Sequence, residues 1–250
     1  MPIAERMNGE SRLSDFDEEI ERARRVYTER AGNPALAKLY GAFAQANFFT
    51  IQERDWALAD LLRRSGLSSL ANLDILDVGC GSGGELRRMT LLGADPTLLV
   101  GIDLMPARVE EAKKALPTAR FEIGSAHQLP FSDASFDLVS QYVVFSSVAH
   151  AGLRQAIAGE MLRVLRPEGR ILWYDIRKLK PTPNLVPIDL VEIKSLFPGC
   201  SIQMRPVTLG WRASHSLVPR SRTAALLLQK LPGTRSHYAG LIRRNASTGR

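Results

Sequence analysis

The sequence has few cysteines and no long apolar run. Its two cysteines, Cys80 and Cys200, cannot build a disulfide framework, and no group of Cys and His residues has the spacing of a metal site. No apolar stretch approaches the ~18 residues that a membrane-spanning helix needs. The segment 1–30 is rich in Glu and Arg and lacks the apolar stretch of a secretory signal. We therefore expect a cytoplasmic protein with no bound metal.

Acidic residues are absent from the last fifth of the chain. Residues 201–250 contain nine Lys and Arg, whereas residues 1–200 contain 24 basic and 26 acidic residues. The net charge of +7 therefore belongs to the C-terminal segment. This charge suits an anionic ligand or peripheral contact with an anionic lipid surface, and it also suits solubility alone. No nucleic acid is expected as a partner, because aromatic residues do not alternate with the basic ones.

The N-terminal segment 1–70 has the periodicity of helices. Apolar residues recur at helical spacing in the segments 16–27, 36–48 and 56–62, and the third segment stops near Gly66. We interpret residues 1–70 as an N-terminal helical cap. Phe48 is expected to pack against the rest of the fold.

Residues 73–177 alternate between strand and helix patterns. The expected strands are 73–78, 98–103, 120–123, 136–144 and 170–176, the last one entered through a turn at 167–169. The expected helices are 85–92, 106–116 and 153–165. Such alternation is typical of an α/β fold in which helices cover both faces of a parallel sheet.

The C-terminal segment 178–250 is less regular. We expect a helix at 189–197, then a strand at 202–209, a helix at 223–231 and a strand at 237–243. A helix inserted between two strands is a natural lid, which we place at about residues 210–232.

The most informative motif follows the first of these strands. Ile75–Val78 leads into the glycine-rich run 79–84, which contains G-x-G-x-x-G through Gly79, Gly81 and Gly84. In a parallel sheet this turn lies at the carboxyl edge, where ligands bind. The spacing alone is a weak signal that would also fit a dinucleotide-binding enzyme.

Two acidic residues make the motif more specific. Asp77 precedes the first glycine by two residues, where a carboxylate would crowd a pyrophosphate but would suit an amino group. Asp103 ends the next strand, where its carboxylate can accept hydrogen bonds from both ribose hydroxyls. Asp103 can also cap the helix that begins at Pro106.

With L-P-F at 129–131 and F-D-L-V at 136–139, the chain resembles the class I S-adenosylmethionine-dependent methyltransferases of the large bacterial type 11 group. These proteins carry D-V-G-C-G-x-G, an acidic residue after the second strand, L-P-F-x-x-x-x-F-D and a late R-V-L-R-P-G-G, which here reads R-V-L-R-P-E-G at 163–169. The resemblance covers about residues 70–177. It implies S-adenosylmethionine as cofactor, a methyltransferase domain at 71–250, and a Rossmann-like, seven-stranded, mostly parallel sheet.

The resemblance also implies roles for individual residues. The methionine moiety of the cofactor would contact Asp77, Gly79, Gly81 and Gly83. The ribose would bind Asp103, and the adenine would lie among Leu104, Ala126 and His127. Gln141 and Tyr142 would face the sulfur that carries the methyl group, and Tyr27 would help to shape the acceptor pocket. The family usually has Asp where Ser125 stands, so the adenine contact departs from the pattern.

His150 follows the fourth strand of this expected sheet. Its ordinary pKa suits a general base for methyl transfer to a hydroxyl, and its position suits equally a polar residue at a helix start.

The expected helical cap and the expected lid together suggest an enclosed pocket for a small-molecule acceptor, such as a hydroxyl of a secondary metabolite, sugar or glycolipid. Two other functions stay open at this point, an NAD-dependent oxidoreductase and a non-catalytic protein that binds S-adenosylmethionine.

Overall fold

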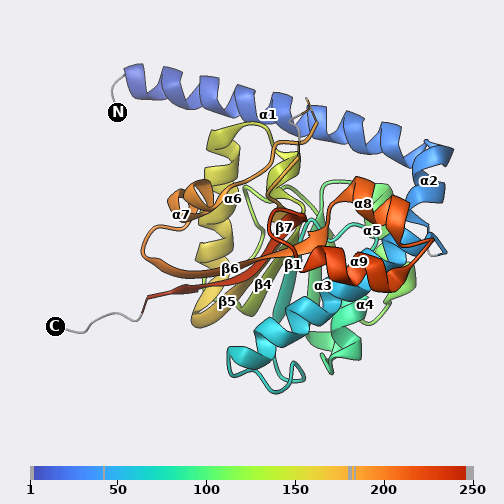
Figure 1. Cartoon of the computed structure of the whole chain (residues 1–250). Coiled ribbons are helices and arrows are strands. Elements are labelled where there is room, and N and C mark those ends of the chain that lie inside the picture. The colour runs from blue at the N-terminus through green and yellow to red at the C-terminus, as the bar shows by residue number, and fades with distance from the viewer. Residues whose placement is uncertain (1–2, 42, 180–181, 183, 246–250) are drawn as a thin grey trace.

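The computed structural model describes residues 3–41, 43–179, 182 and 184–245 (Figure 1). The strands are β1 (Ile75–Val78), β2 (Leu99–Asp103), β3 (Arg120–Ile123), β4 (Phe136–Tyr142), β5 (Leu165–Ile176), β6 (Cys200–Leu209) and β7 (Arg235–Arg244). The α-helices are α1 (Ile3–Ala31), α2 (Pro34–Tyr40), α3 (Gln45–Arg64), α4 (Gly84–Leu91), α5 (Pro106–Ala115), α6 (Ala151–Val164), α7 (Leu190–Leu196), α8 (Trp211–Leu217) and α9 (Arg222–Gln229). Short 3₁₀ turns lie at Pro96–Leu98 and Phe145–Ser147.

The strands form one seven-stranded sheet in the order β3-β2-β1-β4-β5-β7-β6. The first five are parallel to one another, whereas β7 runs antiparallel between β5 and β6. The predicted seven-stranded, mostly parallel sheet is therefore confirmed. Because β6 and β7 pair antiparallel, β6 ends and β7 begins at the same edge where β1 to β5 end.

Two apolar layers hold helices on the two faces of the sheet. On one face, residues of α3, α4 and α5 such as Leu58, Leu86 and Val109 pack together with Ile75 of β1. On the other face, α6 and α7 pack through residues such as Met161. Every residue of β1 is buried, which explains why its sequence is a continuous apolar run interrupted only by Asp77.

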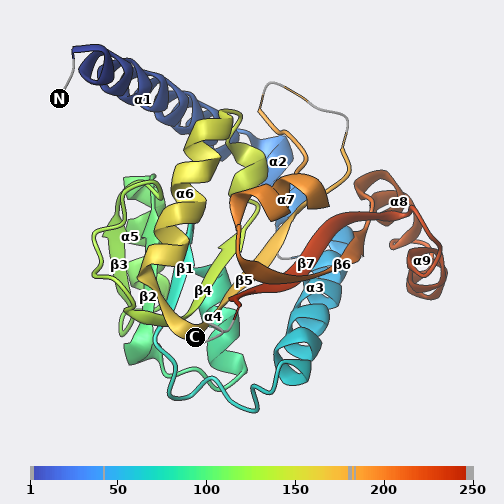
Figure 2. The ribbon, with the colours of Figure 1, turned by 90° about the vertical axis from the view of Figure 1, so that its left-hand side faces the viewer.

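Helix α1 lies across one end of the sheet rather than on either face (Figures 1 and 2). Its Phe16 is buried in the same apolar layer as α6, and Glu19 accepts a hydrogen bond from the amide of Ala149 at 2.5 Å. The end that α1 crosses is therefore the carboxyl edge of β4. The division into a cap at 1–70 and a domain at 71–250 stays a prediction.

The helical segment expected at 36–48 is wrong in detail. Helix α2 ends at Tyr40, and α3 begins only at Gln45. Phe48 is 54% exposed, whereas the next residue, Phe49, is 3% exposed. One residue turns a side chain by about 100° around a helix, so the break between α2 and α3 places the neighbouring phenylalanine inside.

The insertion between β6 and β7 contains two helices, α8 and α9, where the sequence predicted one. Both extend to one side of the sheet (Figure 2), and their inner residues pack with Phe49, Leu209 and Ala225. Helix α8 has only seven residues, which is too few for a periodic pattern to emerge. The role of residues 210–232 as a lid stays a prediction.

Strand β5 begins at Leu165, ahead of the expected start at Arg170. The turn expected at 167–169 is part of this strand, where the pairing of β4 with β5 is irregular and its register shifts between Phe136 and Leu138.

In the described part of the chain, no helix combines the length and the apolar character needed to cross a membrane.

Candidate functional site

The glycine-rich turn connects β1 to α4. Gly79, Gly81 and Gly83 have φ values of 71°, 53° and 75°, a region that side chains disfavour. The amide of Gly79 donates to the carbonyl of Ile102 at 2.8 Å, which pulls the turn against β2. A Cβ at Gly79 would lie 2.6 Å from Val144 Cγ2. The first glycine is therefore required both by its conformation and by the close approach of the chain after β4.

Asp103 fixes this turn from the end of β2. Its Oδ2 accepts from the amide of Gly81 at 2.8 Å, and its Oδ1 accepts from the amide of Met105 at 2.9 Å. The N-cap of α5 is Met105, so Asp103 supports the approach to the helix without capping it. Each carboxylate oxygen keeps a second lone pair for a ligand hydroxyl.

Asp77 is 1% exposed and lies below the same turn. Its Oδ1 accepts from the hydroxyl of Ser140 at 2.7 Å, whereas its Oδ2 has no hydrogen-bond partner among the described residues. Burial raises the pKa of Asp77 to about 8, and repulsion from Glu85 and Asp103 adds to the effect. The site therefore contains a buried carboxyl oxygen that a hydrogen-bond donor or a cation would satisfy.

The buried side chain of Arg54 lies close enough to Asp77 to lower its pKa, and the sequence analysis did not identify this residue. Arg54 of α3 donates to both oxygens of Glu85, at 2.8 and 2.6 Å, and its guanidinium lies 5.1 and 5.3 Å from the ring centres of Tyr142 and Tyr174. Burial lowers the pKa of Arg54, but the neighbouring Glu85, the two tyrosines and Asp55 together outweigh it and raise the pKa above its ordinary value. The spacing in the sequence could have identified Arg54 as a buried residue, because it precedes the buried Leu58 by one helical turn.

The tyrosine ring of β5 that lies near Arg54 also contacts a ring of β7. The ring of His237 stacks on Tyr174 with centres 4.7 Å apart, and the hydroxyl of Tyr174 contacts Thr208 Oγ1 at 2.8 Å. Burial lowers the pKa of His237 to about 3, so this ring is neutral at physiological pH. Thr208 has a φ of 63°, unusual for a β-branched residue, and such strain clusters at functional sites.

Gln141 and Tyr142 lie at the end of β4, as expected. The Gln141 amide accepts from the amide of Val144 at 3.0 Å and donates to the carbonyl of Tyr174 at 3.4 Å. Both ends of this side chain therefore hold backbone, and Val143 in the turn has a φ of 61°. Tyr142 faces Arg54. The expected contacts of Gln141 and Tyr142 with a cofactor stay predictions.

Tyr27 connects α1 to the carboxyl edge. Its hydroxyl donates to Ser147 Oγ at 3.0 Å, and the guanidinium of Arg108 lies 5.0 Å from its ring centre. The same guanidinium lies 3.7 Å from the position of a Cβ at Gly81. The α1 helix therefore reaches the glycine-rich turn through Tyr27 and Arg108.

The residues assigned to an adenine lie in the loops after β2 and β3. Leu104 and Ala126 are partly buried, and the Nδ1 of His127 contacts Ser125 Oγ at 2.7 Å. Phe16 of α1 packs edge-on against His127, with ring centres 5.7 Å apart. The structure brings these loops to the same edge as Asp103, and their ligand contacts stay predictions.

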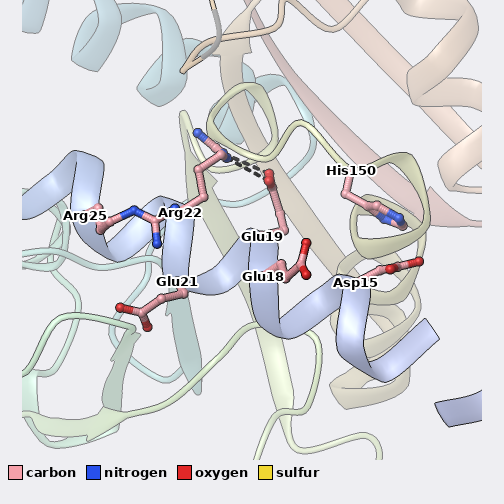
Figure 3. Close-up of a pocket in the computed structure, with 7 residues that line it drawn as sticks. All are labelled: Asp15, Glu18, Glu19, Glu21, Arg22, Arg25 and His150. Atoms are coloured by element: carbon pink, nitrogen blue, oxygen red, sulfur yellow. Dashed lines mark hydrogen bonds and ion pairs between the residues drawn. The ribbon is translucent and has the colours of Figure 1, made fainter. Parts of the chain in front are cut away.

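His150 caps helix α6, which confirms the helix-start interpretation of this residue. Its Nδ1 accepts from the amide of Leu153 at 3.1 Å. This bond occupies the lone pair of Nδ1, and the role of His150 as a general base stays a prediction. His150 also borders a pocket of about 660 Å³ beside α1 (Figure 3). The other residues that line it are Asp15, Glu18, Glu19, Glu21, Arg22 and Arg25.

A family model described as a methyltransferase domain matches residues 76–173. The match runs from β1 to β5 and contains the glycine-rich turn and both acidic residues. Over these residues the chain is similar to a methyltransferase domain. This finding confirms the resemblance to the type 11 methyltransferases.

Among the described residues, no group of three or more His, Cys, Asp or Glu is arranged to hold a metal ion.

Curated methyltransferases are similar to part of the chain. The chain is 32% identical over 157 residues to the 27-O-demethylrifamycin SV methyltransferase of Amycolatopsis mediterranei, a match that covers 60% of this chain and 55% of the relative. It is 37% identical over 110 residues to the phthiotriol/phenolphthiotriol dimycocerosates methyltransferase of Mycobacterium tuberculosis, covering 43% of this chain and 39% of the relative. The chain thus spans about half the length of these relatives or less.

A solved structure shows the same fold. A SAM-dependent methyltransferase from Methanosarcina mazei superimposes with a TM-score of 0.55 at 18% identity, covering 72% of this chain and 96% of that one. At this level of identity the likeness concerns the fold alone.

Because Asp77 is buried, we expect the difference in unfolding free energy between the parent protein and Asp77→Asn to depend on pH. A folded-state pKa near 8, against 3.8 for an ordinary Asp, means that the folded protein binds a proton more tightly than the unfolded chain. Stability from this group therefore falls as pH rises from about 4 to about 8. We expect Asp77→Asn to gain stability relative to the parent over that window, by on the order of a few kcal/mol.

Urea unfolding at about pH 5 and about pH 8 measures this difference. The exposed Asp17→Asn is the matched control, which should change stability by less than about 0.5 kcal/mol at both pH values. A constant gap between the parent and Asp77→Asn across the two pH values would contradict the raised pKa.

Proposed function

We propose that this protein is an S-adenosylmethionine-dependent methyltransferase that methylates a hydroxyl of a small-molecule acceptor, such as a secondary metabolite, sugar or glycolipid. The methyltransferase domain supports the reaction class. The names of the relatives from Amycolatopsis and Mycobacterium, given above, support an acceptor of this kind.

The unpartnered Oδ2 of Asp77 is the observation that carries the proposal. A buried acceptor without a donor costs about 1–3 kcal/mol, so the site is suited to a ligand that supplies one. The α-amino group of S-adenosylmethionine is a cationic donor that matches this oxygen. A pyrophosphate would instead oppose the ionisation of Asp77 through its own negative charge and would offer this oxygen no cationic donor. The residues present therefore fit the cofactor.

Other residues at the carboxyl edge would hold the rest of the cofactor. Asp103 has lone pairs left for ribose hydroxyls, and Leu104, Ala126 and His127 lie in the two loops beside it. When bound, S-adenosylmethionine supplies a methyl group made electrophilic by the positive sulfur. Gln141 and Tyr142 follow Asp77 across the edge, toward β5, so we place the transfer there.

The main contribution of the chain to the reaction is positioning. Tyr27 and Arg108 bring α1 against the glycine-rich turn, and Tyr142 lies under Arg54. Holding donor and acceptor in line and excluding water can supply about 7–11 kcal/mol of barrier lowering. Catalysis at an activated methyl group therefore does not require a strong base from the protein.

The sheet separates this proposal from an oxidoreductase. Dinucleotide-binding folds have the strand order 3-2-1-4-5-6. Here the strand after β5 is the antiparallel β7, and three helices precede β1. A non-catalytic protein would keep Asp77 and Asp103 but would not transfer the methyl group, so turnover distinguishes that case.

Calorimetric titration tests the cofactor. We expect S-adenosylmethionine to bind and NAD not to bind. Asp103→Ala should weaken S-adenosylmethionine binding by about 1.5–3 kcal/mol, because charge-assisted hydrogen bonds are lost. The exposed Asp133→Ala serves as the control and should bind like the parent. Binding of NAD without S-adenosylmethionine would overturn the proposal.

Two substitutions at His150 separate its possible roles. We expect His150→Asn to keep turnover, because Asn caps helices well, and His150→Ala to lower stability by about 1 kcal/mol. If His150 were the base, both variants would lose about 10²–10⁴-fold in turnover with unchanged cofactor affinity. Methyl transfer from isotopically labelled S-adenosylmethionine into host-cell extract, read by mass spectrometry, provides the assay and identifies the acceptor.

A further inference from the structure

The α8–α9 insertion has an inner and an outer surface. The inner residues Leu217, Leu226 and Leu228 pack around Phe49 of α3 and the buried Ala225. This contact anchors the two helices to the fold. What the outer residues do is not explained by the methyltransferase domain, which ends its match at residue 173.

Three large apolar side chains lie on the outside of the insertion. Trp211 is 50% exposed, Leu227 is 59% exposed and Leu231 is 55% exposed. Leu227 lies in the last turn of α9, and the exposed Lys230 and Leu231 directly follow the end of this helix. Exposed apolar side chains interspersed with basic ones are typical of segments that lie on a membrane surface, and Trp favours the interfacial layer of lipid.

The basic side chains of the insertion are also directed outward. Arg212, Arg220, Arg222 and Lys230 are exposed, and within the described ranges none of the four forms an ion pair with a carboxylate. By contrast, Arg205 of β6 pairs with Asp60 at 2.8 Å. The insertion between β6 and β7 therefore carries four exposed basic side chains without a carboxylate partner among the described residues.

The insertion leaves the sheet at the carboxyl edge. Strand β6 ends at Leu209 and β7 begins at Arg235, and both points lie at the edge that carries the glycine-rich turn. Figure 2 shows α8 and α9 extending sideways from the far end of the sheet. A surface bound to these helices would therefore lie at the carboxyl edge of the sheet, on the side of β6 and β7.

We propose that the outer surface of the insertion that contains α8 and α9, formed by Trp211, Leu227, Leu231 and the four basic residues, docks onto an anionic lipid bilayer. Charge complementarity selects this partner, because residues 210–232 contain four basic and no acidic residues. The exposed leucines and tryptophan enter the headgroup layer, while the basic residues contact lipid phosphates. This docking does not depend on the methyl-transfer proposal, since it involves none of the cofactor residues.

Co-sedimentation of the full chain with vesicles tests the docking. We expect binding to phosphatidylglycerol vesicles, weaker binding at high salt, and little binding to phosphatidylcholine vesicles. The double variant Arg222→Gln, Lys230→Gln should bind phosphatidylglycerol roughly 25-fold more weakly, from about fivefold for each basic residue. Leu227→Glu should weaken binding at least about tenfold, because a carboxylate then faces anionic lipid.

Matched controls lie on other elements of the molecule. Lys113→Gln, Lys114→Gln removes two exposed charges from α5, and Leu91→Glu alters an exposed leucine at the end of α4. Both should bind vesicles like the parent. Equal binding to the two lipids, no binding to phosphatidylglycerol, or parental binding by the α9 variants while they keep native circular dichroism would each overturn the proposal.

Discussion

The carboxylate of Asp103 is the contact on which the site depends. It joins the end of β2 to the turn after β1 through the amide of Gly81, and it does so while the turn adopts three left-handed glycine conformations. The amides of Gly79 and Cys80 donate to the carbonyl of Ile102, so the end of β2 holds this turn at two neighbouring residues. The same turn follows Asp77, whose buried carboxyl group has a hydrogen-bond partner at only one of its two oxygens among the described residues. One interaction thus links the sheet, the turn and the buried acid.

Burying an acid in this way is costly for the folded protein alone. Asp77 keeps one oxygen without a partner among the described residues, close to Glu85 and Asp103, and these neighbours add to the pKa rise caused by burial. Arg54 lies close enough to oppose the rise, but it is held by Glu85 and by the two tyrosine rings. Such local instability is expected where a ligand rather than the protein supplies the final contact. The strained residues Val143 and Thr208 lie at the same edge, and backbone strain of this kind clusters at functional sites.

Much of the central fold could be predicted from the sequence because its signals are local. Strand β1, the glycine turn and the alternation up to β5 follow from apolar runs, glycines and prolines. The antiparallel place of β7, the break before α3 and the second helix of the insertion depend on tertiary contacts. Phe49 shows the reason, since its partners Leu209 and Ala225 come from the other end of the chain. Arg54 was missed for the same cause, because its partners come from α4, β4 and β5.

The central claim is that Asp77 receives a cationic amino group, and proton exchange on binding tests it most directly. Calorimetry of S-adenosylmethionine binding near pH 7, in two buffers of different ionisation enthalpy, counts the protons released. With a pKa of about 8, Asp77 is mostly protonated before binding and must ionise to pair with an ammonium group. The account predicts release of nearly one proton, tighter binding as pH rises toward 8, and loss of this release in Asp77→Asn. Binding with no proton release, or the same release in Asp77→Asn, would contradict it.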